Sequence, residues 1–173
     1  MQKAKRVAAL LVILLTTVGC DQATKSIAQS QLSTAGTLTF LNGMVRLQYV
    51  ENPGAFLSLG AGLSDQAQHL IFTVSVAIVL TIVFFFALRE SLKASGTVLV
   101  ALALFLGGGI GNLIDRVVND GRVIDFMNIG IGSLRTGIFN VADMALMAGV
   151  ALLVLYSYRT QASTRPAEAN GEN

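Results

Sequence analysis

Two aspartates in the second half of the chain have the residue type and the setting for acid–base chemistry. Asp143 lies on an apolar segment that predicts a helix from Thr136 to Tyr158, and Asp125 lies in the preceding loop VIDF. Because a helix rises about 1.5 Å per residue, Asp143 is expected roughly 10 Å below the helix start. Burial there favours a protonated carboxyl group. Two such groups within hydrogen-bonding distance share one proton, so that one accepts a proton from water while the other donates to a carbonyl oxygen.

Amide and guanidinium side chains accompany the two aspartates. Asn140 precedes Asp143 by one helical turn, and Asn112, Asp115 and Arg116 have the spacing of one helix face. Amides and a guanidinium can hold a peptide backbone or orient a carboxyl group without adding acidic protons. We therefore expect these side chains to line the same site.

Two further features of the chain have more than one interpretation. Asp21 and Lys25 lie four residues apart on one face of the first apolar segment, either as a structural ion pair or as part of a site. Residues 107–109 are all glycine, which favours close helix packing. A phosphate-binding loop is the weaker reading of the glycines because no GK[ST] follows.

The composition indicates that a membrane positions these groups. Among 173 residues, 12 Lys+Arg and 10 Asp+Glu make 13% charged against 53% hydrophobic, and the mean hydropathy is +0.66. So few charges argue against a water-soluble enzyme and against a disordered chain. Four mainly apolar segments are each long enough to cross about 30 Å of hydrocarbon, which predicts an all-α fold of four transmembrane helices. They are residues 7–27, 70–88, 94–114 and 136–158.

Basic residues in the short flanks predict the orientation, because Lys and Arg resist translocation. Seven lie on the side of the two termini and four on the opposite side. We therefore expect both termini in the cytoplasm. Residues 1–159 are predicted to form a single membrane domain, and residues 160–173 a disordered cytoplasmic tail.

A small β region is predicted on the outer face of the membrane, over about residues 36–60. Apolar and polar residues alternate on both sides of Asn42-Gly43, a pair that suits a type I′ hairpin because both residues accept positive φ. After it, residues 65–72 could begin a short interfacial helix leading into the second span.

Several classes of partner and chemistry are excluded by simple counts. A net charge of +2 implies no nucleic-acid partner, one cysteine forms no internal disulfide, and one histidine supplies no zinc cluster. The basic N-terminus followed by Gly19-Cys20 also resembles a lipoprotein signal that is cleaved before Cys20. Thr17 replaces the usual leucine of such a signal, so a retained first helix is the better interpretation.

Five motifs in order, DQATK, NPGA, GGGIGNLIDR, VIDF and FNVAD, run from Asp21 to Ala145. With their membrane placement they resemble the lipoprotein signal peptidase (signal peptidase II) family of bacterial membrane aspartic peptidases. The resemblance implies that Asp125 and Asp143 are the catalytic pair. Asp115 and Gly108 are expected to support the site structurally. The positions that the resemblance assigns to the substrate pocket are Asn52, Gly54, Asn112, Arg116, Asn140, Asp21 and Lys25.

The resemblance also implies an activity and a location. The substrate would be a diacylglyceryl-modified prolipoprotein, cleaved by an activated water just before the lipidated cysteine. The site would lie near the periplasmic face of the inner membrane beside a β-cradle, which agrees with the predicted hairpin. We expect no cofactor and no metal, membrane lipid as a partner, and a monomer. Residues 54–58 read GAFLS where the family usually has a doubled alanine and then phenylalanine, which changes the expected pocket rim.

Rival functions remain open on the sequence. Asp115, Asp120, Asp125 and Asp143 could be Mg²⁺ ligands of a membrane transferase, although DGxxAR is absent. Asp143 and Lys25 could be relays in a small transporter. Serine, zinc and presenilin-like peptidases fit poorly, because His69 is the single histidine and neither HExxH nor GxGD occurs. The charges between residues 115 and 135 are expected to position the peptide at the mouth of the site.

Overall fold

Four long helices and a four-stranded antiparallel sheet make up the fold. The computed structural model describes residues 2–53, 64–91 and 95–164. The helices are α1 (Gln2–Ala35), α2 (Asp65–Ser91), α3 (Gly96–Val118) and α4 (Val141–Thr164). Each is long and apolar enough to cross a membrane, which confirms the predicted membrane fold.

The helix bounds differ from the predicted spans. α1 continues eight residues past Ile27, and α2 runs unbroken from Asp65 in place of a separate interfacial helix. α4 continues to Thr164, so the first residues of the predicted tail are helical. The rest of that tail, and Gly54 with the altered rim, lie outside the described residues.

The largest difference concerns the start of α4, which begins at Val141 and not at Thr136. Phe139 pairs instead with Met127 in an isolated bridge to the sheet. Asp143 is therefore in the first helical turn, and the expected depth of roughly 10 Å below the helix start is wrong. A backbone pairing outside the helix has replaced the first turn that the apolar pattern predicted.

α3 lies at the centre of the bundle. Its glycines allow this, since a Cβ on Gly108 would meet the backbone oxygen of Ala142 in α4, and a Cβ on Gly107 would meet Thr17 in α1. Buried Leu10 and Leu106 belong to the core between these helices. The glycine run thus serves close helix packing, as its composition indicates.

The sheet joins two distant parts of the chain. β1 (Leu38–Phe40) and β2 (Val45–Asn52) form the predicted hairpin, and β2 pairs with β3 (Val123–Ile131), followed by β4 (Leu134–Arg135). Asn42 and Gly43 both have positive φ, as predicted, and the N–H of Met44 donates to the carbonyl oxygen of Leu41 (3.1 Å). The segment VIDF, predicted as a loop, is the start of β3, with Asp125 opposite Val50.

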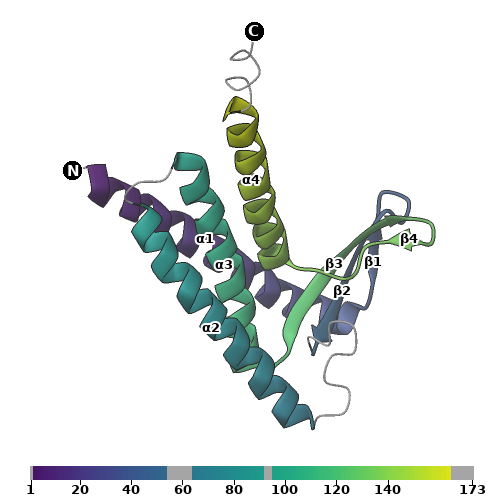
Figure 1. The fold of residues 1–173 in the computed structure, drawn as a ribbon. Helices are drawn as coiled ribbons and strands as arrows, with labels where there is room; N and C mark the ends of the chain where they lie inside the picture. Colours follow the sequence, from purple (N-terminus) through teal and green to yellow (C-terminus); the bar gives the residue numbers. More distant parts are fainter. Residues whose placement is uncertain (1, 54–63, 92–94, 165–173) are drawn as a thin grey trace.

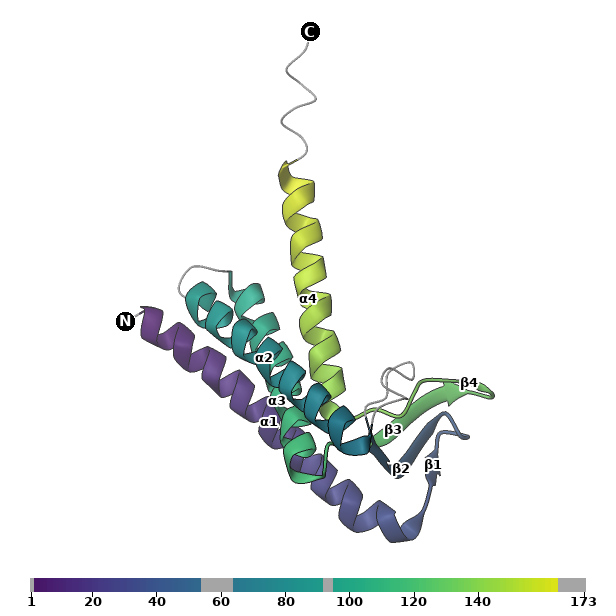
Figure 2. The ribbon, with the colours of Figure 1, turned by 60° about the horizontal axis from the view of Figure 1, so that its bottom comes forward.

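The N-terminal end of α1 and the C-terminal end of α4 lie at one end of the helical bundle, and the sheet projects from the other (Figure 1). α4 diverges from the other three helices toward its C-terminal end, and the second view shows the same divergence (Figure 2). The outer part of α1 supports the sheet, because Ala28 and Leu32 pack with Phe126 of β3. The bridge between Met127 and Phe139 and the hydrogen bond from Asn140 to Asp125 bring the start of α4 to the start of β3.

Candidate active site

Asp125 is held near the start of β3 by two amides. It is 2% exposed. Asn52 of β2 donates to its Oδ2 (2.9 Å), and Asn140 donates to its Oδ1 (2.7 Å). Burial raises the pKa of Asp125 to about 6, and the charge of Asp143 acts in the same direction, while the two amide hydrogen bonds oppose the rise. This carboxyl group therefore holds a proton to a higher pH than an exposed aspartate does.

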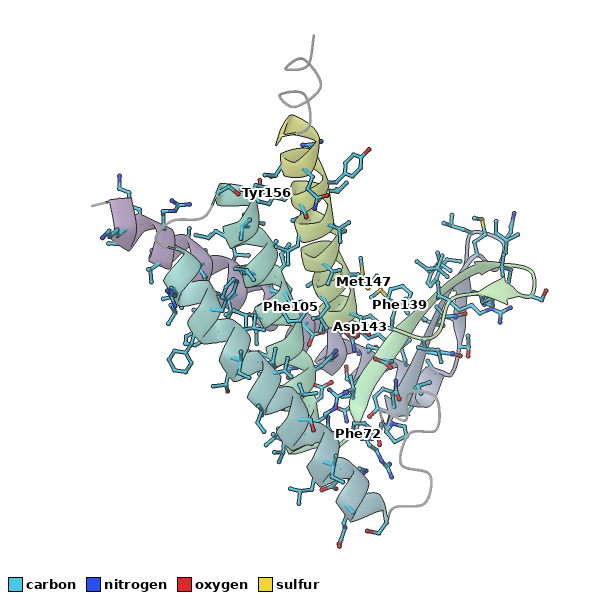
Figure 3. All side chains as sticks on the ribbon, in the orientation of Figure 1. Phe72, Phe105, Phe139, Asp143, Met147 and Tyr156 are labelled. Atoms are coloured by element: carbon cyan, nitrogen blue, oxygen red, sulfur yellow. The ribbon has the colours of Figure 1, made fainter. Side chains whose placement is uncertain are left out.

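Asp143 forms a capping box with Asn140 at the start of α4. The backbone N–H of Asp143 donates to Asn140 Oδ1 (2.9 Å), and the backbone N–H of Asn140 donates to Asp143 Oδ2 (3.1 Å). Asn112 of α3 donates to the other oxygen, Oδ1 (2.8 Å). The side chain lies at the sheet end of α4, near Phe139 (Figure 3). The helix cap thus fixes the position of the carboxyl group.

The same two asparagines connect the aspartates. The amide of Asn140 donates to Asp125 and also to Asn112 Oδ1 (3.1 Å), and Asn112 donates in turn to Asp143. The carboxyl groups are therefore joined through amides. Sharing of a single proton between them stays a prediction.

A buried ion cluster lies behind this pair. Lys25 is 2% exposed and Asp21 0%. The Lys25 ammonium contacts Asp21 Oδ2 (2.7 Å) and Asp115 Oδ2 (2.9 Å), and donates to Asn112 Oδ1 (2.9 Å). An ammonium has three N–H groups, so each has a protein acceptor. Asp21 and Lys25, expected at the substrate pocket, are here enclosed where α1 meets α3 and the start of α4.

A cavity of about 420 Å³ between α2, α3 and α4 reaches Asp143. Asn112 and Arg116 line it beside the carboxyl group, and Val76, Phe105 and other side chains make the remaining wall mostly apolar. Nη1 of Arg116 donates to the backbone oxygen of Asn112 (3.1 Å). A polar site is thus reached through an apolar cavity.

One contributor to the polar site was not singled out from the sequence. Gln22, within the motif DQATK, donates to Asp115 Oδ1 (2.9 Å) and to the backbone oxygen of Gly111 (3.2 Å). Its position beside Asp21 was the available signal. A glutamine does not ionise, so its residue type alone does not mark it as costly in a membrane.

The charges between residues 115 and 135 have several different partners. Arg122 pairs with Glu51 across the sheet at a solvent-exposed position (3.0 Å). Arg135 donates to the backbone oxygen of Gly43 (2.9 Å) and to Asn128, which ties β4 to the hairpin. Arg135 is thus used to hold the sheet together. Within the described ranges, no three His, Cys, Asp or Glu side chains gather as a metal site.

The fold and the site define a class, a multi-pass membrane protein with acidic and amide side chains beside an apolar cavity at one end of its helices. The family model described as Signal peptidase (SPase) II matches residues 13–159. The chain belongs to the signal peptidase II family, which is a family of peptidases.

Individual relatives agree with this membership. The lipoprotein signal peptidase of Borrelia hermsii is 34% identical over 152 residues, with 84% of this chain and 87% of that protein covered. That of Bifidobacterium adolescentis is 36% identical over 174 residues, covering 96% and 86%. Two solved bacterial membrane enzyme structures are similar, one at 26% identity and TM-score 0.71 (87% and 93% covered). The other has 25% identity and TM-score 0.72 (94% of each chain covered).

Proposed function

We propose that this protein is an aspartic endopeptidase that removes the signal peptide from diacylglyceryl-modified prolipoproteins, cleaving just before the lipidated cysteine. The observation that carries the proposal is that Asn112 hydrogen-bonds Asp143 and Asn140 hydrogen-bonds Asp125, beside a cavity. Membership of the signal peptidase II family supports the same reaction.

The proposed reaction uses one proton shared by the aspartate pair. The ionised carboxylate takes a proton from a water, whose oxygen forms a bond to the scissile carbonyl carbon. The neutral carboxyl group donates to the carbonyl oxygen. When the tetrahedral intermediate collapses, the C–N bond breaks and the carboxyl group that took the proton of the water gives it to the departing amine nitrogen. The other carboxylate takes a proton back from a hydroxyl group of the intermediate, which restores the carbonyl of the new carboxyl terminus and leaves the pair with one proton. A pKa of about 6 for Asp125 supports a pair that keeps a proton at mildly acidic pH.

Amides and a guanidinium are proposed to hold the substrate and the pair. Asn112 and Arg116, which line the cavity, are suited to bind the peptide backbone, with Asn52 on the opposite side of Asp125. Asn140, expected to bind substrate, is fully buried and donates to Asp125 and Asn112, so it is suited to hold the pair. The apolar walls of the cavity between α2 and α4 suit entry from the bilayer, with the acyl chains remaining in lipid. Gly54 stays a proposed pocket residue on the resemblance alone.

We further propose that the protein works as a monomer in the bacterial inner membrane, with both termini in the cytoplasm. The start of α1 and the end of α4 lie at one end of the bundle (Figure 1), and basic residues accumulate in the flanks of these helix ends in the sequence. The sheet and the aspartate pair then lie near the periplasmic face.

A metal-dependent transferase is less well supported. Asp115, one of its four supposed ligands, already accepts the Lys25 ammonium and the backbone N–H of Ile124 (both 2.9 Å). A transporter is separated by the assay itself, since transport leaves prolipoprotein uncut.

The test is cleavage of a diacylglyceryl-modified prolipoprotein by the purified protein. Asp125→Asn and Asp143→Asn keep the side-chain volume and remove the ionisable group, so each is expected to lower the rate at least about a hundredfold while the protein still inserts. Activity should survive EDTA. Normal rates in both variants would show the assignment of the pair to be wrong, and loss of wild-type cleavage in EDTA would show that a metal ion takes part in the cleavage.

A further inference from the structure

The carboxylates of the buried ion cluster, Asp21 and Asp115, each accept a hydrogen bond from the backbone next to one member of the aspartate pair. Oδ1 of Asp21 accepts the backbone N–H of Ala142 (2.9 Å), and Oδ2 of Asp115 accepts the backbone N–H of Ile124 (2.9 Å). Ala142 immediately precedes Asp143, and Ile124 immediately precedes Asp125. Each buried carboxylate thus binds the backbone N–H of the residue just before one member of the pair.

Lys25 connects the two carboxylates that make these hydrogen bonds. Its ammonium contacts Asp21 at 2.7 Å and Asp115 at 2.9 Å. The cluster therefore links the start of α4 to the start of β3 through a single nitrogen atom.

The third N–H of Lys25 reaches the pair by another route. It donates to Asn112 Oδ1 (2.9 Å), and because an ammonium has no acceptor, this contact turns the carbonyl of the Asn112 amide toward Lys25. The amide nitrogen of Asn112 must then face the opposite way, toward Asp143 Oδ1 (2.8 Å). Lys25 thus fixes which end of the amide meets the carboxyl group.

We propose that Lys25, Asp21 and Asp115 form a clamp that sets the separation and orientation of Asp125 and Asp143 for the reaction. The three are positioning residues and touch no substrate. The clamp rests on the proposed function, because it is the geometry of that aspartate pair that it serves.

If Lys25 and its partners served only to stabilise the fold, their neutralisation would have a different effect. Replacing a buried ion pair with neutral side chains often leaves stability unchanged or improved. A clamp, in contrast, cannot be neutralised without loss of rate, since a displacement of about 1 Å at a reacting group can lower the rate a hundredfold. Neutralisation therefore separates the two roles.

The test variant is the double substitution Lys25→Met/Asp21→Asn, which removes one positive and one negative charge. Asp115 keeps the hydrogen bond from Gln22, which limits the damage to folding, but loses the ammonium that holds its Oδ2 at the Ile124 N–H. Leu10→Ala is the matched control, since it opens a cavity in the core of the same helix without touching the clamp.

Two readouts are measured on the full-length protein in detergent. The first is prolipoprotein cleavage, in which kcat is expected to fall about tenfold to a hundredfold while KM changes less than about twofold. The second is backbone hydrogen exchange at Ala142 and Ile124, which is independent of activity and is expected to speed up about tenfold or more. Leu10→Ala should leave both readouts as in the wild type once the protein is folded.

The outcomes separate the clamp from the proposed function. Faster exchange with a fall in kcat alone supports the clamp, whereas unchanged exchange or a wild-type kcat overturns it. If the wild-type protein cuts no prolipoprotein, the proposed function is wrong. In that case the exchange readout still tests the cluster, because unchanged exchange at Ala142 and Ile124 in the double variant would show that the cluster does not hold these two backbone positions. Should the double variant fail to fold, Lys25→Arg is measured in its place. A charge-retaining side chain of different donor geometry is expected to lower kcat without changing KM, and a wild-type kcat for Lys25→Arg would overturn the clamp.

Discussion

The carboxyl group of Asp125 lies in surroundings that oppose its ionisation. Burial and the charge of Asp143 raise its pKa from 3.8 to about 6, while the amides of Asn52 and Asn140 and the charge of Lys25 act in the opposite direction. Its proton is therefore retained below about pH 6 and lost above it. In the proposed reaction, no acid remains to donate to the substrate carbonyl once both aspartates are ionised.

Because Asp125 loses its proton as the pH rises, the rate of cleavage should depend on pH. The apparent kcat/KM should have an alkaline limb that falls as the aspartate pair loses its last proton. In Asn52→Leu the limb should move upward by about half a unit to one unit, because the Asn52 hydrogen bond favours the ionised form. The measurement is a pH profile of cleavage for both proteins. A limb that stays in place, or moves downward, in Asn52→Leu contradicts the assigned contact.

Residue type alone singles out individual carboxyl groups in this sequence, but it does not predict which side chains lie beside them. Asp125 and Asp143 were chosen because carboxyl groups in an apolar chain are costly, and that cost depends on residue type alone. The bond from Asn52 to Asp125 was out of reach, because it needs β2 and β3 to pair across about seventy residues of chain. Gln22 was missed because an uncharged side chain gives no such signal.

At the scale of elements, one side chain at the start of α4 both caps the helix and contacts the aspartate of β3. Asn140 accepts the backbone N–H of Asp143 as a helix cap, and its amide nitrogen donates to Asp125 and Asn112. The pattern N-x-x-D in FNVAD is a capping signal that could have located this helix start from the sequence. The apolar periodicity, which counts only side-chain hydropathy, placed the start five residues too early.

The two roles of Asn140 can be separated by substitution. Asn140→Ser keeps a capping oxygen, whereas Asn140→Ala does not, so the serine variant should be more stable by about 1 kcal/mol. Both variants lose the amide that holds Asp125, so cleavage should fall to a similar low rate in each. Denaturant unfolding and the cleavage assay measure the two effects. Wild-type cleavage by Asn140→Ser would show that the cap alone accounts for this residue.

Gly108 makes a second element-level prediction, on the contact between α3 and α4. In Gly108→Ala the new methyl group would meet the backbone oxygen of Ala142, so α4 must shift and carry Asp143 with it. We expect lower stability and a large loss of cleavage. Gly96→Ala is the control on the same helix, because nothing lies within 4 Å of its added Cβ. Equal behaviour of the two variants would contradict close packing at Gly108.

At the scale of the whole molecule, the membrane fold could be predicted almost entirely from composition, whereas the link between its parts could not. Apolar length predicts each helix by itself. The cluster around Lys25 depends on α1, α3, β3 and α4 meeting at one place, which only the packed structure defines. The spacing of Asp21 and Lys25 on one helix left both of its interpretations open, and the structure shows an ion pair that also reaches the site.

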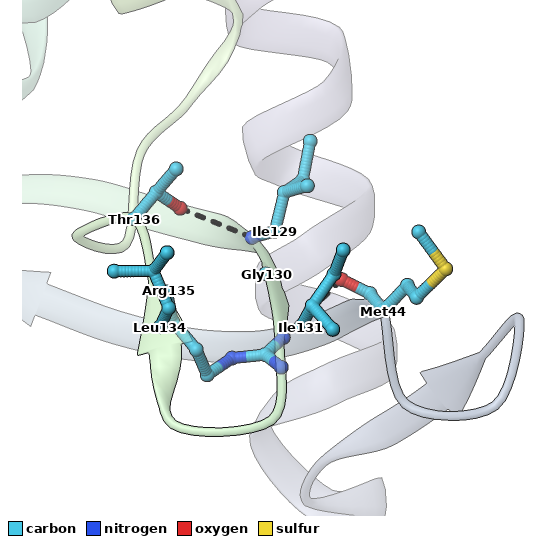
Figure 4. A pocket seen from close by; sticks show the side chains of 7 residues that line it. All are labelled: Met44, Ile129, Gly130, Ile131, Leu134, Arg135 and Thr136. Atoms are coloured by element: carbon cyan, nitrogen blue, oxygen red, sulfur yellow. Dashed lines mark hydrogen bonds between the residues drawn. The ribbon is translucent and has the colours of Figure 1, made fainter.

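The free end of the sheet supplies a prediction about the placement of the molecule in the bilayer. Leu41, Ile131 and Leu134 are 70%, 72% and 83% exposed, and the last two line a shallow apolar pocket with Met44 (Figure 4). Apolar side chains so exposed at one tip favour contact with lipid at the membrane interface. The chain contains no tryptophan, so Leu134→Trp introduces a single fluorescent probe. Its emission should be quenched by brominated phospholipids, as should that of Val154→Trp, an exposed position within the span of α4. Quenching at Val154→Trp without quenching at Leu134→Trp would place the tip of the sheet in water, away from the bilayer.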